Sequence, residues 1–461
     1  MKSLDEIQAF IDTEFAGLVR DHKVPGAVVA VLKDGEIIDA AGGVLSTSTL
    51  VDATPDSVFQ IGSITKVWTA TLVLQLVDDG LLDLDAPIQT YVTDFHLADE
   101  ASAASITTRQ LLSHQGGFEG DVFTDTGRGD DAIAKYIAEI AELPQLFSPG
   151  ELFSYNNVGF SILGRLVEVL REKTWEQALL DHIVTPLGLT HVAPSAYEAI
   201  LHRAAVGHVG PGEDGVEIAA PTWALARSNE PAGSMLAMRP RDLVSFVKMH
   251  LDGGTAPDGT RILSEQSVAA MQTKHVDLPR LTGMGDAWGL GWEIIDSSAP
   301  TVLGHDGGTI GQAAFLRIVP EAGLAVALLT NGGDVFGLFE DVVARILDEV
   351  AGVTLPGHPL PPAEHAAVDA TAYLGLYADT IYDLVVSQDE DGRVWLDRTP
   401  KDIIAEIGGQ PDRSELVAFG PDSLIGVEGQ RGIHPIYVFL GDAGDGRAKY
   451  IHYGRVVTRA A

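Results

Sequence analysis

The sequence has no cysteine, few basic residues and no long uninterrupted hydrophobic segment. The lack of cysteine excludes disulfides, thiolate metal sites and a cysteine nucleophile, and it fits a reducing compartment. A transmembrane helix needs about 18 consecutive apolar residues, and no such run occurs, so no membrane-spanning helix is expected.

Acidic residues outnumber basic ones by 65 to 30, which gives a formal net charge of −35 at pH 7. The acidic residues are dispersed and form no acidic tail. A chain of this charge repels nucleic acid and anionic membranes, so neither is expected as a partner. With 461 residues, 46% of them hydrophobic, the chain can bury a sizeable core and form two or three domains.

The N-terminal segment reads as an amphipathic helix. Apolar residues recur at helical spacing from Leu4 to Val19. Asp5, Glu6 and Asp12 interrupt any run that could serve as the apolar core of a secretion signal. We therefore expect a cytoplasmic protein.

The region after this helix predicts a hairpin and a second helix. Residues 27–32 and 36–41 read as strands joined by a turn at Asp34-Gly35. Residues 64–78 read as a helix that ends at a glycine. Its inward face is expected to carry Val67, Leu72, Leu76 and Val77.

The remaining pattern predicts one large domain, over residues 1–352, and one small one. A mostly helical subdomain occupies about 85–250, strand-like runs begin at 288, and a last helix covers 335–352. Strands from both ends are expected to form one mostly antiparallel sheet covered by helices, an α/β (α+β) fold.

A second domain is expected after a proline-rich linker. Residues 353–364 contain four prolines, and we place the linker at 353–368. Residues 369–461 show repeated strand and turn signals, which predict a small antiparallel β-barrel or sandwich.

A serine followed by a lysine three residues later stands at the start of the 64–78 helix. Ser63 and Lys66 would share one helical face, and the positive helix end would favour negative charge at Ser63. Serine needs a neighbouring base to act as a nucleophile, and a buried lysine can provide one. Spacing alone is weak evidence, because Ser245 and Lys248 repeat it in mid-helix, where a surface pair is the better interpretation.

Two further motifs follow in order, Tyr155-Asn156-Asn157 and His305-Asp306-Gly307. Together with Ser63-Ile64-Thr65-Lys66 they resemble the motifs of the serine β-lactamase and penicillin-binding-protein superfamily. Flanking segments such as "VPGAVVAVLKDGE", "LLSHQGGF" and "WGLGW" are similar to its class C-like branch, over about residues 5–350. The resemblance implies an antiparallel sheet flanked by helices, with an inserted helical subdomain.

The resemblance also implies roles for the motif residues. Ser63 corresponds to the acylated nucleophile and Lys66 to its base or proton relay. Tyr155 corresponds to a second proton relay, as a phenolate stabilised by the lysine. Asn157 would bind the substrate amide and steady Lys66. His305 stands where many β-lactamases have a lysine, and it would orient the substrate or help Tyr155.

The strand after His305 is expected to complete an oxyanion hole, with one N–H from Gly308 and one from Ser63. Gly307 would let the substrate backbone approach closely. We interpret His114, in "LLSHQGG", as structural. The remaining histidines form no metal-binding pattern, so no metal or cofactor is expected.

The motifs do not select the acyl group. The superfamily includes β-lactamases, D-peptidases, esterases and acyltransferases, so a peptide-like amide, ester or thioester at a D-residue is expected. The C-terminal domain resembles the lipocalin-like appendage of some D-peptidases and of penicillin-binding-protein-type thioesterases. The latter cyclise peptides taken from a carrier protein, so a peptidyl carrier protein is a possible partner.

Three alternatives remain open: a peptide-cyclising thioesterase, a carboxylesterase or D-aminopeptidase, and a non-catalytic binding module on the same fold. Arg447 or Arg455 could reach from the C-terminal domain to bind a substrate terminus, although a solvated surface arginine is the simpler interpretation of either.

Overall fold

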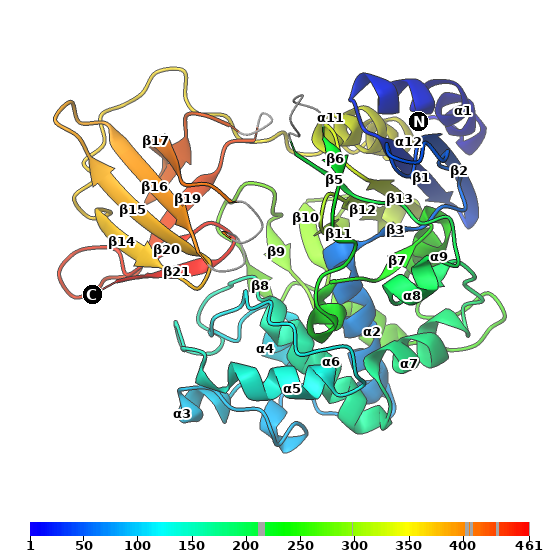
Figure 1. The fold of residues 1–461 in the computed structure, drawn as a ribbon, viewed down its shortest axis with the longest axis horizontal. Helices are drawn as coiled ribbons and strands as arrows, with labels where there is room; N and C mark the ends of the chain where they lie inside the picture. Colours follow the sequence, from blue (N-terminus) through cyan, green and yellow to red (C-terminus); the bar gives the residue numbers. More distant parts are fainter. Residues whose placement is uncertain (211–216, 297, 402–404, 406–408, 430–432, 461) are drawn as a thin grey trace.

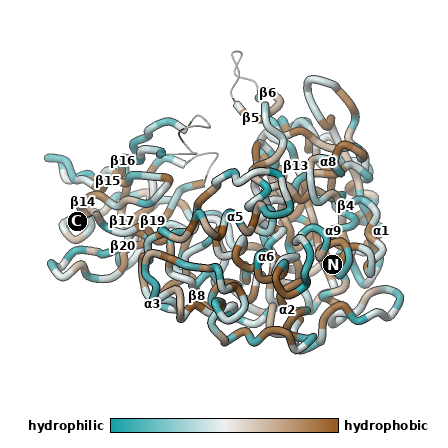
Figure 2. Tube along the Cα trace, turned by 60° about the horizontal axis from the view of Figure 1, so that its bottom comes forward, coloured by the Kyte–Doolittle hydropathy of each residue, from teal (hydrophilic) through white to brown (hydrophobic). Residues whose placement is uncertain are grey.

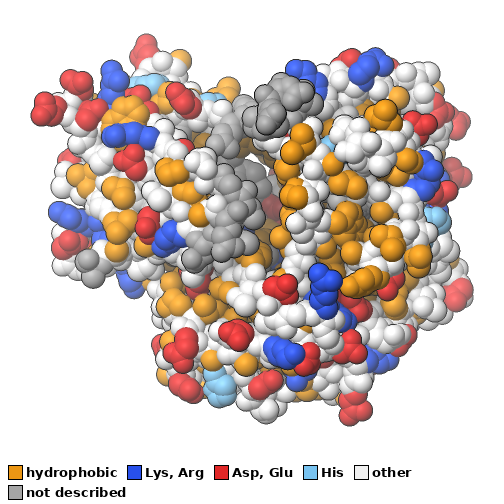
Figure 3. All heavy atoms as spheres, viewed as in Figure 1, with side chains coloured by type: hydrophobic (Ala, Val, Ile, Leu, Met, Phe, Trp, Pro, Cys, Tyr) orange, Lys and Arg blue, Asp and Glu red, His pale blue; other side chains and the backbone are white. Residues whose placement is uncertain are grey.

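The computed structural model describes residues 1–210, 217–296, 298–401, 405, 409–429 and 433–460. A large domain of helices around a sheet and a smaller barrel lie side by side (Figure 1). The predicted α/β (α+β) class is therefore confirmed. On the face drawn in Figure 3, acidic side chains are scattered over both domains.

The core of the large domain is an eight-stranded antiparallel sheet. Its strands, in spatial order, are β2 (Glu36–Gly43), β1 (Gly26–Lys33), β13 (Leu324–Thr330), β12 (Ala313–Val319), β11 (Val302–Gly308), β10 (Glu293–Asp296), β9 (Ala287–Trp288) and β8 (Val276–Asp277). Because β1 pairs with β13, strands from both ends of the domain meet in one sheet, as predicted.

The β1–β2 hairpin forms where the sequence predicts it. Asp34 and Gly35, the two turn residues, have φ of +50° and +88°. A two-residue turn with both φ values positive matches the right-handed twist of the flanking strands. The hairpin register pairs Lys33 with Glu36, and it continues to Gly26 opposite Gly43.

Helices cover both faces of the sheet. On one face lie α1 (Leu4–Asp21), α11 (Val335–Phe339) and α12 (Arg345–Ala351), which pack on apolar side chains of β1, β12 and β13. The predicted 335–352 helix is α11 and α12 joined by a π-helical turn, Glu340–Ala344. On the other face lie α2 (Thr65–Asp78) and α9 (Pro240–Leu251).

Helix α2 is buried on all sides, which corrects the expectation of a single inward face. All side chains from Thr65 to Leu76 are buried, and Trp68 stacks on Phe246 of α9 with ring centroids 3.9 Å apart. In Figure 2, parts of α2 and of α6 (Asn157–Arg171) appear as brown hydrophobic segments. A fully enclosed helix can hold a catalytic side chain away from water.

The large domain also contains further short helices, strands and turns. The helices are α3 (Glu100–Ala103), α4 (Thr108–Leu112), α5 (Ala132–Glu139), α7 (Trp175–Leu179), α8 (Ala196–Ala199) and α10 (Glu265–Gln272). The short strands are β3 (Phe59–Gln60), β4 (Val192–Ala193), β5 (His208–Val209), β6 (Ile218–Ala219) and β7 (Ala237–Met238). Short 3₁₀ or π turns occupy Gly62–Ile64, Ile88–Thr90, Ile140–Glu142, Leu180–Val184, Arg227–Ala232 and Pro320–Ala322.

The C-terminal domain is a closed antiparallel barrel. Its strands are β14 (Gly375–Ala378), β15 (Tyr382–Gln388), β16 (Val394–Pro400), β17 (Asp412–Gly420), β18 (Ser423–Gly426), β19 (Ile436–Leu440), β20 (Tyr450–His452) and β21 (Val456–Arg459). Alternating side chains such as Leu384, Val386 and Leu396 fill its interior. The barrel packs on the large domain, where the Tyr450 hydroxyl donates to Leu146 O at 3.1 Å.

None of the helices in the described ranges is both long enough and apolar enough to cross a membrane.

Candidate active site

The serine predicted as nucleophile lies in the tight turn that begins α2. This turn, Gly62–Ile64, has 3₁₀ geometry and leads directly into the helix. Gly62 has φ of +50°, and a Cβ there would lie 2.6 Å from Gly308 N. Glycine is required at this point because strand β11 passes directly against the turn.

Lys66 lies one turn later with its side chain fully buried. Its Nζ is 3.0 Å from Ser63 Oγ and also donates to Ala232 O at 2.6 Å. Desolvation lowers the pKa of Lys66 well below its usual value, the Arg455 cation lowers it further, and Asp121 opposes both. A lysine in this state can release its proton and act as a base towards Ser63.

The comparison pair Ser245 and Lys248 behaves differently. Ser245 Oγ donates back to Arg241 O at 2.8 Å within α9, and Lys248 forms an ion pair with Asp252. Both side chains are partly exposed. The same spacing therefore gives a hydrogen-bonded serine–lysine pair only at the buried start of α2.

Tyr155 covers the lysine. Lys66 Nζ lies 4.9 Å from the centroid of the Tyr155 ring, and the Ser63 hydroxyl favours the ionised form of the phenol. Burial raises the pKa of Tyr155, which favours the neutral phenol. This direction contradicts the phenolate implied by the resemblance, because desolvation penalises the charged form more than Ser63 and the Arg455 cation stabilise it.

His114 supports Tyr155 from behind. The two rings stack with centroids 4.3 Å apart, and His114 Nδ1 accepts from Asn156 N at 3.0 Å. Burial lowers the pKa of His114 well below its usual value. We therefore interpret His114 as a structural residue that holds the backbone of Asn156 and the ring of Tyr155 in place.

His305 is buried beside the same cluster. Its ring lies 6.2 Å from that of Tyr155, and its Nδ1 is 2.6 Å from Asp306 O. Burial lowers the pKa of His305 to about 3, so it is a neutral imidazole at pH 7. Because the carbonyl of Asp306 can only accept, Nδ1 carries the proton and Nε2 is left as an acceptor.

The two glycines after Asp306 bring β11 against the nucleophile turn. A Cβ on Gly307 would lie 1.9 Å from Ile61 O and 3.0 Å from Ser63 N, whereas a Cβ on Gly308 would meet nothing within 4 Å. The backbone N–H groups of Ser63 and Gly308 are therefore near neighbours. Their assignment as an oxyanion hole stays a prediction that this geometry permits.

The side chains of Asn156 and Asn157 make different hydrogen bonds. Asn156 caps α6, because its Oδ1 accepts from Gly159 N at 2.7 Å. Asn157 Nδ2 donates to Asp121 Oδ1 at 2.6 Å. The acceptors described for Lys66 are Ser63 and Ala232, so the proposed steadying of Lys66 by Asn157 remains a prediction.

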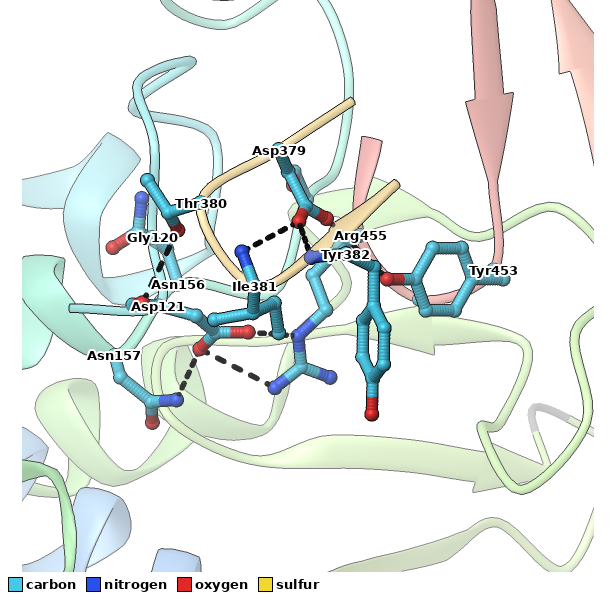
Figure 4. A network of polar contacts seen from close by, with 12 residues as sticks. Gly120, Asp121, Asn156, Asn157, Asp379, Thr380, Ile381, Tyr382, Tyr453 and Arg455 are labelled. Carbon is cyan, nitrogen blue, oxygen red and sulfur yellow. Dashed lines mark hydrogen bonds and ion pairs between the residues drawn. The ribbon is translucent and has the colours of Figure 1, made fainter. Parts of the chain in front are cut away.

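A side chain from the barrel completes the site. Arg455 Nε donates to Asp121 Oδ2 at 2.5 Å (Figure 4). The guanidinium carbon of Arg455 lies 4.9 Å from the Tyr155 ring centroid. Arg447 lies instead on an exposed turn, with Asp445 at 3.7 Å. Of the two arginines considered from the sequence, Arg455 is therefore the one that reaches the site.

Two contributors could not be recognised from their own sequence context. Asp121 lies in a run of several acidic residues, and nothing local distinguishes it from Asp125 or Asp130. Ala232 contributes only a backbone carbonyl, which has no sequence signature. Among the described residues, no group of His, Cys, Asp and Glu is arranged to hold a metal ion.

Comparison with known proteins decides the family. The family model described as "Beta-lactamase" matches residues 11–349. The chain belongs to the beta-lactamase family. "Penicillin-binding protein 4" of Amycolatopsis lactamdurans is 43% identical to this family member over 366 residues, which are 79% of this chain and 95% of that protein.

Solved structures extend the similarity to the barrel. SurE superposes with a TM-score of 0.80 at 29% identity, over 99% of this chain and 100% of SurE, and SurE with D-Leu gives 0.76 at 28%. The D-amino acid amidase of Ochrobactrum anthropi SV3 complexed with D-phenylalanine gives 0.61 at 25%, over 74% of this chain and 99% of that one. This beta-lactamase family member is thus, at a coarse level, a serine acyl-enzyme hydrolase.

Proposed function

We propose that this protein forms an acyl-enzyme at Ser63 with a peptide-like amide, ester or thioester, at a residue of D configuration. The observation that carries the proposal is the 3.0 Å contact between Ser63 Oγ and the buried Nζ of Lys66. Burial disfavours the ammonium form of Lys66, and a neutral amine at this distance can take the hydroxyl proton.

In acylation, Ser63 Oγ bonds to the substrate carbonyl carbon while its proton passes to Lys66. The resulting oxyanion accepts hydrogen bonds from the backbone N–H groups of Ser63 and Gly308. The bond to the leaving group then breaks, and that group departs with a proton delivered from Lys66 through the Tyr155 phenol. In deacylation, water or a substrate amine attacks the ester, its proton returns by the same relay, and Ser63 is regenerated.

The neutral state of His305 bears on the substrate. A penicillin-like carboxylate would gain no fixed positive charge from this imidazole. Nε2 of His305 is buried and has no hydrogen-bond partner among the described residues, so this group is a neutral acceptor and not a cation. This property favours a peptide-like substrate over a β-lactam.

Two of the similar structures support the proposal of a D-configured substrate residue: SurE with D-Leu and a D-amino acid amidase with D-phenylalanine. The full-length similarity to SurE, barrel included, favours one particular form of the proposal. In that form a peptide thioester, delivered by a peptidyl carrier protein, is released by attack of its own amine to give a ring.

The first experiment is intact-mass spectrometry after treatment with a fluorophosphonate. The wild-type protein should gain one adduct, and Ser63→Ala should gain none. An adduct that persists in Ser63→Ala would overturn the assignment of the nucleophile.

The second experiment offers a thioester of a short peptide that ends in a D-residue, beside the same peptide ending in an L-residue. Cyclic product from the D-peptide supports the cyclase form, whereas free acid alone supports a hydrolase. Equal turnover of both peptides would refute the stereochemical part of the proposal.

A further inference from the structure

The barrel meets the catalytic tyrosine through one turn, residues 453–455, between β20 and β21. Gly454 O accepts from Tyr155 N at 3.0 Å, and Val456 N donates to Ser154 Oγ at 3.0 Å. His452 Nε2 lies 2.8 Å from Phe153 O. Three contacts, one from the turn and two from the adjoining ends of β20 and β21, therefore fasten the barrel to the segment that ends in Tyr155.

A chain of polar contacts extends from this turn to the second motif. Arg455 Nε and Nη2 lie 2.5 and 3.5 Å from the two oxygens of Asp121, and Asp121 accepts from Asn157 Nδ2 at 2.6 Å (Figure 4). The side chain of Asp121 is 5% exposed and that of Arg455 is 33% exposed. The carboxylate is therefore shared between the two domains at a nearly buried position.

We propose that Arg455 and Asp121 are positioning residues of the active site, through which the docked barrel orients Asn157 and holds the Tyr155 ring over Lys66. The inference rests on the proposed acyl-enzyme function. It assigns the barrel a part in the chemistry of the large domain.

The orientation of Asn157 follows from the chemistry of its partner. A carboxylate only accepts hydrogen bonds, so the amide must turn its NH₂ group to Asp121 and its carbonyl oxygen away. An uncharged Asn at position 121 could donate as well as accept, and both orientations of Asn157 would become possible. Loss of Arg455 would leave Asp121 nearly buried without its cation, which is strongly unfavourable.

Three side chains lie against the ring of Tyr155. The guanidinium carbon of Arg455 and Nζ of Lys66 each lie 4.9 Å from its centroid, while His114 stacks on it. A cation over an aromatic face is attracted to it, and Arg455 can therefore fix the ring without touching the hydroxyl.

Arg455 and Asp121 change the pKa of Lys66 in opposite directions. The groups that face Lys66 are Tyr155, His114 and His305, all uncharged at neutral pH, and the charged groups Arg455 and Asp121. Arg455 lowers the pKa of Lys66 and Asp121 raises it.

The test compares Arg455→Gln, Arg455→Lys, Asp121→Asn and the double variant Arg455→Gln/Asp121→Asn with the wild type. The readout is the second-order rate of Ser63 labelling by a fluorophosphonate between pH 5 and 10, together with kcat and KM for an activated ester. Arg413→Gln is the matched control, because Arg413 lies on β17 of the barrel with a side chain 54% exposed. Thermal unfolding identifies any variant that has lost its fold.

Arg455→Gln should lower the labelling rate by roughly 10- to 100-fold, mainly through kcat, and move the acid limb of the profile to higher pH. Asp121→Asn should move that limb to lower pH, and the double variant should return it towards the wild type. Arg455→Lys keeps the positive charge, so its acid limb should stay at the wild-type position. The control Arg413→Gln should match the wild type.

Two results would overturn the inference: folded single variants whose acid limbs do not move, or limbs that move in the same direction. If Arg455→Gln does not fold, Arg455→Lys and Asp121→Asn carry the comparison. Failure of the proposed function is a distinct result, because the wild-type protein would then gain no adduct at Ser63.

Discussion

Replacing Gly307 with alanine should slow the acylation of Ser63 about a hundredfold while the protein stays folded. Gly307 lies on β11, where it passes the turn that carries the nucleophile. A Cβ at this position would lie 1.9 Å from Ile61 O and 3.0 Å from Ser63 N. Both neighbours are backbone atoms in a buried turn, so neither can rotate away as a side chain would.

The size of the effect follows from how far β11 and the nucleophile turn must move apart to make room for the new Cβ. Ordinary van der Waals contact begins at 3.4 Å, so β11 and the Ile61–Ser63 backbone must separate by roughly 1.5 Å. That separation moves Gly308 N–H away from Ser63 N–H, and a displacement of about 1 Å at a reacting centre can cost about 10²-fold in rate. Overpacking of this kind costs about 1–3 kcal/mol of stability, which a domain of this size can tolerate.

The assay is the rate of Ser63 labelling by a fluorophosphonate, followed by intact mass, with the melting temperature measured on the same samples. Gly308→Ala is the matched control, because a Cβ there meets nothing within 4 Å and the backbone N–H is kept. A folded Gly307→Ala protein that labels at the wild-type rate would refute the argument that β11 and the nucleophile turn form the oxyanion hole.

Three further predictions follow from single groups. Lys66→Ala should lower the labelling rate by about 10²- to 10⁴-fold, whereas Lys248→Ala should leave it unchanged. Tyr155→Phe keeps the stack on His114 but removes the hydroxyl, so ester turnover should fall by at least about tenfold while the melting temperature changes little. Burial and the nearby Asp306 raise the pKa of Glu293 from 4.5 to about 7. The folded state therefore favours the protonated acid, and the free energy of unfolding should fall by about 3 kcal/mol as pH rises from about 4.5 to about 7. Denaturant unfolding of the wild type and Glu293→Gln at pH 5 and 8 checks this, and an equal loss in both proteins would contradict it.

Local sequence patterns were sufficient to predict the helices and strands of the fold and to find the three motifs. Asp34-Gly35 predicts the hairpin turn because only residues that tolerate positive φ fit it, and the structure has both residues there. Ser63 and Lys66 share a face because a helix places positions i and i+3 together. The proline-rich stretch at 353–364 predicts a break between domains for a similarly local reason.

Other properties of the site depend on residues distant in sequence. The same Ser-x-x-Lys spacing is a surface pair at Ser245, and burial of α2 by surrounding helices makes the difference at Ser63. Because burial penalises a charge, it also decides that Tyr155 is a phenol and His305 a neutral imidazole.

The sequence by itself therefore predicted which residues would carry the chemistry, since their spacing along one helix and at the starts of elements is a local property. The tertiary structure decided their protonation states and their supports. Asp121 and Arg455 meet across more than 300 residues of chain, and Ala232 offers only a carbonyl. Such contacts arise when segments distant in sequence pack together, and no local pattern encodes them.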